Sequence, residues 1–252
     1  MKSLFFLMAT VFYGLATLSV NFSIGMAFTL MSIGFIANII SIYVILYHSF
    51  PLVPLFQKSF FIPAILTLIF FISYIRKSEE KILNHKIFFI FIFIISVLFL
   101  FFPGGYYLPF LKTKSIFSHI YFYSLIIGNC LFITAGLSCI DQFIRKNNFK
   151  KYNISYISWG VFFLSISMFS GEIWSYLQTG SPIVWEDPCI FGYMAIWFYY
   201  VGFLHLYLVR RIGGKIRAYL LLLGLAMIFF LFILPETGRF SMPEVRLWLA
   251  RY

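Results

Sequence analysis

Charged residues are scarce in this chain: Asp, Glu, Lys and Arg make up 11% of its 252 residues, and only eight residues are acidic. Soluble domains carry about 25% charged residues and roughly 45–50% apolar ones. Here 62% of the residues are hydrophobic, and 35 of them are Phe. So few charges cannot cover an aqueous surface. The composition therefore excludes a soluble globular enzyme and a disordered chain, and it predicts an all-α, polytopic transmembrane helical bundle.

Cysteine is also rare, and the basic excess has a simple interpretation. Cys130, Cys139 and Cys189 are too few to form a disulfide framework. The net charge is +11. In a membrane protein Lys and Arg collect in cytoplasmic loops and set the orientation. We therefore expect no nucleic-acid partner.

Long apolar runs occupy most of the chain. A membrane span needs about 20 largely apolar residues. Eight segments meet this requirement, and we expect them to form a single integral membrane domain over residues 1–252. The predicted spans are approximately 3–21, 24–47, 59–75, 87–103, 116–140, 154–173, 189–209 and 218–235.

The distribution of Lys and Arg predicts the orientation. Twelve of the 19 basic residues fall in the loops after the first, third, fifth and seventh spans. These loops are short, so the positive-inside rule places them in the cytoplasm and both termini outside. The start of the chain also has features of a signal peptide, with Lys2, an apolar stretch and small residues near Ala16–Ser19. Cleavage there would remove the first span and reverse this orientation, so that alternative stays open.

The four histidines are the candidate metal ligands. His205 lies in the seventh span, whereas His119 and His48 lie at the outer ends of the fifth and second spans, and His85 lies in a cytoplasmic loop. An ionisable group within a span suggests a function by default. Neutral His is also the commonest metal ligand and a usual axial ligand of haem iron. An ordinary helix-bonded or interfacial histidine remains the alternative at each position.

Helix geometry divides the candidates into two tiers. Asp187 and His205 are 18 residues apart, which is about 27 Å along a helix. The hydrocarbon core is about 30 Å thick, so these two residues cannot contact the same haem. His119 and His48 share the outer tier with Asp187. Trp197 lies eight residues before His205, on the same side of the predicted helix.

Several motifs follow one another in the second half of the chain. Ser170-Gly171-Glu172-Ile173-Trp174 precedes Trp185-Glu186-Asp187-Pro188, and Trp197 and Leu204-His205 follow at fixed spacing. They resemble Ser-Gly-Ala-Val-Trp and Trp-Asp-Pro of the CcsA/ResC-type haem-handling membrane proteins of cytochrome c biogenesis, with CcmC as a more distant relative. The resemblance covers roughly residues 116–235. It extends weakly to residues 45–60, where His48-Ser49-Phe50-Pro51-Leu52 resembles the family's Gly-His-Phe-Pro-Leu loop.

The resemblance implies a role for each matched residue. His119 would be an external axial ligand of haem b, His205 an intramembrane ligand, and His48 a further candidate. Haem would be cradled on the outer face by a loop and its neighbours, namely Trp174, Trp185, Asp187 and Trp197. The resemblance implies no catalytic side chain.

The resemblance also implies partners and a location. The family delivers haem to the Cys-X-X-Cys-His motif of apocytochrome c, and its members work with a ResB-type membrane partner in a haem-lyase (synthase) complex. The membrane would be the bacterial inner (cytoplasmic) membrane or an organellar equivalent. The loop that holds Trp185 and Asp187 would lie on its periplasmic or lumenal face.

Two departures from the family pattern keep other functions open. Residues 179–184 lack the family's additional tryptophans, and residues 234–240 lack its second external histidine. The alternative is an accessory or scaffold subunit that kept the fold but lost haem ligation. Eight spans would also suit a small-solute transporter or channel, although few charges lie within the spans to mark an ion path.

Overall fold

The computed structural model describes residues 2–50, 52, 57–75, 85–104, 115–144, 151–183, 185, 187–208 and 213–241. Every regular element in these ranges is helical, which confirms the predicted all-α fold. The helices are α1 (Lys2–Ser19), α2 (Ile24–Ser49), α3 (Lys58–Ile75), α4 (His85–Phe101), α5 (Ile116–Ile144), α6 (Lys151–Thr179), α7 (Pro188–Leu208) and α8 (Gly214–Ile228). A π-helical turn, Phe229–Ile233, and a 3₁₀ turn, Leu234–Glu236, continue α8 without a break.

The helices have the lengths that a membrane requires. Within the described ranges, six helical segments are long and apolar enough to cross one: Ile24–Ser49, Lys58–Ile75, Ile116–Ile140, Ile154–Thr179, Pro188–Leu208 and Gly214–Glu236. The apolar parts of α1 and α4 are shorter. Each of the eight predicted segments coincides with one helix. The chain is thus an integral membrane protein built of transmembrane helices.

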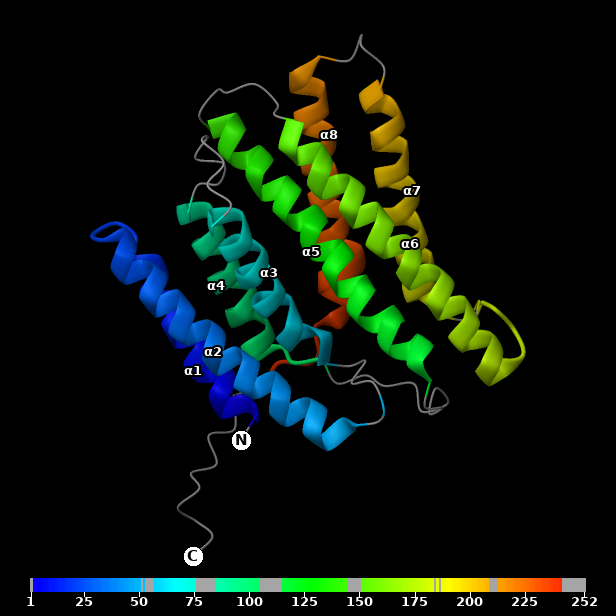
Figure 1. The fold of residues 1–252 in the computed structure, drawn as a ribbon, viewed down its shortest axis with the longest axis horizontal. Helices are drawn as coiled ribbons and strands as arrows, with labels where there is room; N and C mark the ends of the chain where they lie inside the picture. The colour runs from blue at the N-terminus through cyan, green and yellow to red at the C-terminus, as the bar shows by residue number, and fades with distance from the viewer. Residues whose placement is uncertain are drawn as a thin grey trace, which may run out of the picture.

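Successive helices run in alternating directions (Figure 1). The starts of α3, α5 and α7 therefore meet the ends of α2, α4, α6 and the α8 run at one end of the bundle, drawn at the bottom of Figure 1. We call it the lower end, and the opposite one the upper end. Within the bundle α1 packs along α2, and α5 packs along α6. Backbone hydrogen bonds from Gly238 to Phe102 and from Ser241 to Phe101 fasten the segment after α8 to the end of α4.

Aromatic rings and glycines hold the second half of the bundle together. The Phe132 ring on α5 stacks on the Tyr200 ring of α7, with centroids 3.8 Å apart and planes 2° apart. The same Phe132 ring meets α6 at Gly160, where an added Cβ would lie 2.5 Å from the ring. Small residues permit such close approach between membrane helices. The Phe132 ring of α5 therefore packs against both α6 and α7.

The sequence prediction for the sixth span was wrong at its end. The predicted span stops at residue 173, but α6 continues to Thr179 and is followed by Gly180, whose φ is +72°. A glycine in this left-handed conformation is a common helix terminator. As a consequence Trp174, which lies beyond the predicted end of the span, belongs to α6.

Candidate functional site

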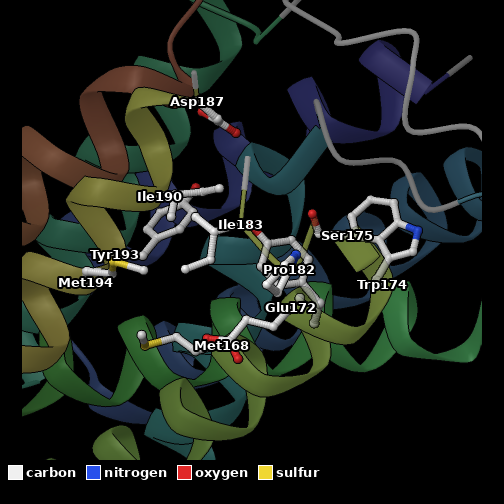
Figure 2. Close-up of a pocket in the computed structure, with 12 residues that line it drawn as sticks. Met168, Glu172, Trp174, Ser175, Pro182, Ile183, Asp187, Ile190, Tyr193 and Met194 are labelled. Carbon is white, nitrogen blue, oxygen red and sulfur yellow. The ribbon is translucent and has the colours of Figure 1, made fainter. Parts of the chain in front are cut away.

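A cavity lies at the lower end of the bundle, between α5, α6, α7 and the connection between α6 and α7 (Figure 2). Its volume is about 90 Å³, below the roughly 300–1,000 Å³ typical of ligand pockets. It accommodates a substituent or a small ligand rather than a whole porphyrin. The lining residues are Tyr121, Met168, Gly171, Glu172, Trp174, Ser175, Pro182, Ile183, Asp187, Ile190, Tyr193 and Met194.

Local hydrogen bonds shape the segment that closes the cavity. The Ser175 hydroxyl on α6 donates to the Ser181 carbonyl oxygen at 2.8 Å, which folds the chain back after Gly180. At the other end of the connection, Asp187 Oδ1 accepts the backbone N–H of Cys189 at 2.9 Å. Pro188 takes the first position of α7, where the missing N–H costs nothing. Asp187 thus caps α7 and faces the cavity at once.

Trp174 forms a wall of this site rather than an exposed platform. Its side chain is only 5% exposed, and its ring lies 5.9 Å from the Tyr121 ring, measured between centroids. Tyr121 reaches this position across Gly171, where an added Cβ would lie 2.9 Å from the Tyr121 ring. The two aromatic rings and the glycine therefore form one packed unit between α5 and α6.

The structure places the candidate histidines in two tiers. His48 ends α2 and His119 begins α5, both at the lower end, whereas His205 lies near the upper end of α7. His119 is half-buried, and its Nδ1 lies 3.1 Å from the carbonyl oxygen of Ser115. His205 is exposed, and its Nδ1 lies 2.8 Å from the carbonyl oxygen of Val201. Because a carbonyl only accepts, both hydrogen bonds require Nδ1–H and leave Nε2 as the ring acceptor.

The remaining predicted tryptophans differ from each other. Trp185 is 61% exposed, and its ring lies 5.9 Å from that of Phe191 on α7. Trp197 is half-buried, and its Nε1–H donates to the Ser165 hydroxyl oxygen at 2.8 Å, which joins α7 to α6. Of the seven predicted residues, only Trp174 and Asp187 line the cavity. His48 is exposed beside Tyr47, with ring centroids 5.6 Å apart.

A buried ion pair at the lower end was missed by the sequence analysis. Lys58 Nζ lies 2.6 Å from Glu236 Oε1 and 3.0 Å from the Tyr193 hydroxyl oxygen, and the exposed fractions of the two charged side chains are 8% and 11%. Tyr193 lines the cavity, so the hydrogen bond from Lys58 helps to hold a residue of the cavity wall in place. The sequence held one signal of this pair, because Lys58 and Glu236 are single charges that each border an apolar segment. This signal was missed because few charges were expected within the spans.

Glu172 is a second charge that the sequence analysis did not single out as functional. It is half-buried, it lines the cavity and it lies within the membrane-crossing segment Ile154–Thr179. No residue in the described ranges forms a hydrogen bond or an ion pair with its carboxylate. Among those same residues, no three His, Cys, Asp or Glu side chains cluster as a metal site.

The lower end therefore combines two imidazoles, those of His48 and His119, with exposed aromatic rings and a small cavity that is lined by two carboxylates. An imidazole can ligate a metal that brings its other ligands with it, as haem does. Comparisons with protein-family models, curated proteins and solved structures found no match for this chain. A function must be argued from these residues.

Proposed function

We propose that the protein is a haem-handling subunit of a cytochrome c assembly complex, and that it binds haem through His119 and His205. One observation carries the proposal. Each histidine donates its Nδ1–H to a carbonyl oxygen of the preceding turn, at 3.1 Å and 2.8 Å, so each Nε2 is left for iron. Metal-bound histidines almost always have such support, which fixes the ring and raises its basicity.

The proposal includes an orientation. All eight helices cross the membrane, the lower end and both termini face outside, and His205 lies in the inner half of the bilayer. The ends of α1, α3, α5 and α7 and the starts of the helices that follow them lie at the upper end (Figure 1). Twelve of the 19 basic residues lie next to these ends in the chain, within residues 76–86, 145–151 and 210–217. The positive-inside rule then favours a cytoplasmic upper end.

The residues at the lower end suggest how haem b would be held. His119 would supply one nitrogen ligand, and the exposed rings of Trp185 and Phe191 offer a surface for an aromatic macrocycle. The cavity itself is too small for the macrocycle, so haem would lie outside it. A ResB-type partner would then cover the exposed face of the haem. The missing ligand would come from this partner or from His48.

The chain's contribution in this proposal is positioning. Bound haem supplies the vinyl groups that form thioethers with the Cys-X-X-Cys-His thiols of apocytochrome c. Holding two reactants in place accelerates a reaction without an acid–base pair. Asp187 caps α7 through its bond to the Cys189 N–H, so its role is to fix the start of that helix.

Haem content of the purified protein tests the proposal. The chain is expressed with and without a ResB-type partner, and haem is measured as the pyridine haemochrome. We expect haem in the complex, less haem in H119A and in H205A, and unchanged haem in H85A, which removes a histidine outside the proposed sites. A complex whose H119A/H205A double variant retains full haem would refute the proposal.

A scaffold subunit without haem is the second candidate, and one observation favours it. The segment after α8, where the resembled family has another external histidine, has a structural role here. Glu236 forms the ion pair with Lys58, and the Phe240 ring stacks on Phe101 with centroids 6.1 Å apart. A stable complex that forms without haem, and that lacks haem in every preparation, would favour this candidate.

A further inference from the structure

Glu172 is an ionisable side chain inside a membrane-crossing helix, and such residues usually serve a function. It lies two turns before the end of α6 at Thr179, with a half-buried side chain. No described residue pairs with its carboxylate, so the described part of the chain supplies no counter-charge for Glu172. A buried or half-buried charge is costly without a partner. The chemistry of the cavity that Glu172 lines indicates which partner suits it.

The cavity walls suit a cation with an apolar stem. Glu172 lies at one side of the cavity and Asp187 at the other, with the side chains of Ile183, Ile190 and Tyr193 between them (Figure 2). Aromatic rings attract cations through the negative face of their π-systems. The other aromatic and soft residues of the lining are Tyr121, Trp174, Met168 and Met194.

The charge balance excludes an anionic ligand. None of the described lining residues is Lys or Arg. Lys58 contacts the hydroxyl of the lining residue Tyr193, but Glu236 already neutralises this ammonium at 2.6 Å. A carboxylate or phosphate entering the cavity would therefore meet Glu172 and Asp187, with no unpaired positive charge on the described lining residues to offset them.

We propose that this cavity binds an organic cation, a primary or quaternary ammonium on a short apolar stem, with Glu172 as its counter-charge. Asp187 adds negative potential from the opposite side, and the rings of Tyr121 and Tyr193 contact the ammonium or its stem. A cavity of about 90 Å³ has room for a group of this size. The site is separate from the proposed haem ligands, so it stands or falls independently of haem binding.

Calorimetric titration of the detergent-solubilised full chain with n-butylammonium tests the site, with micelles alone as the blank. Butanol and butyrate serve as neutral and anionic probes of the same stem. We expect butylammonium to bind, and both other probes to bind at least about tenfold more weakly, because a charged hydrogen bond is lost. Equal binding of butanol and butylammonium would overturn the proposal without any variant.

Two variants sharpen the test. E172Q keeps the shape of the side chain and removes its charge, and we expect it to weaken butylammonium binding by at least about tenfold. D141N removes a carboxylate from the opposite end of α5 and should bind as the wild type does. Unchanged binding in a folded E172Q would overturn the proposal. If E172Q fails to fold, the three probes on the wild-type chain still decide it.

Lipid nanodiscs identify the source of the ammonium. The titration is repeated in phosphatidylglycerol discs with and without phosphatidylethanolamine. If a lipid amine headgroup is the natural occupant, phosphatidylethanolamine will weaken butylammonium binding by competition. If a free amine is the natural occupant, the affinity will be the same in both discs. Loss of the preference for butylammonium over butanol in both discs would contradict the proposal.

Discussion

Lys58 Nζ and Glu236 Oε1 lie 2.6 Å apart, although 178 residues separate them in the chain. Lys58 begins α3, and Glu236 ends the helical run that starts at Gly214. The run reaches Lys58 through a π-helical turn and a 3₁₀ turn, an irregular backbone of the kind that often marks functional sites. The pair therefore fixes the lower end of the bundle, directly behind the cavity wall.

Removing one partner of this ion pair should destabilise the protein strongly. K58M leaves the Glu236 carboxylate buried without a counter-charge, a change that costs about 3–5 kcal/mol in comparable proteins. Thermal or denaturant unfolding in detergent measures the loss. The double variant K58M/E236L should recover much of it, because a well-packed apolar pair replaces buried charges at little cost. Strictly additive losses would contradict the pairing.

The Tyr193 hydroxyl should make a smaller contribution. Y193F removes the oxygen that accepts a hydrogen bond from Lys58 at 3.0 Å and keeps the ring. We expect the free energy of unfolding to fall by no more than about 3 kcal/mol, because a hydrogen bond to a charged group contributes about 1.5–3 kcal/mol. In the K58M background the same substitution should have almost no further effect. A loss of equal size in both backgrounds would show that the hydroxyl acts on something other than Lys58.

Gly160 should not tolerate a side chain. In G160A the new Cβ would meet the Phe132 ring, which is itself stacked on Tyr200 and cannot move freely. Overpacking of this kind costs about 1–3 kcal/mol. G202A is the matched control, since an added Cβ at Gly202 has no described neighbour within 4 Å. Unfolding midpoints of the two variants should differ, and equal midpoints would contradict the close packing of α5 against α6.

The orientation can be measured with reporter fusions. A reporter active only outside the cytoplasm should be inactive when fused after α3 or α5, and active when fused in residues 180–185. The physical reason is the basic charge of the loops at the upper end. Fusions with the opposite activities would reverse the membrane placement, and with it the proposed external position of His119.

Local composition explains how much of the fold was predictable. The apolar runs determine where helices form, so each of the eight predicted segments coincides with a helix. Their ends depend on less regular signals, and the end of α6 at Thr179 rests on one glycine, Gly180, in a left-handed conformation. The predicted span therefore ended just before Trp174, whereas Trp174 lies on the helix.

The candidate site was less predictable, because its contacts join distant parts of the chain. The residue types of His119 and His205 made them visible, and the spacing along α7 separated the two tiers. No feature of the neighbouring sequence indicated that Lys58 pairs with Glu236, or that the Trp197 N–H donates to Ser165. Such pairings depend on how helices pack, which a single sequence does not state.

Rescue of a His119 variant by imidazole tests the central claim most directly. The partner-bound H119G complex is prepared in haem-sufficient cells, with and without added imidazole, and its oxidised and reduced absorption spectra are compared with those of the wild type and H85G. We expect H119G to lose haem absorption and to regain it with imidazole, while H85G resembles the wild type throughout. An H119G complex with the full, unshifted haem spectrum of the wild type in the absence of imidazole would show that His119 does not ligate haem.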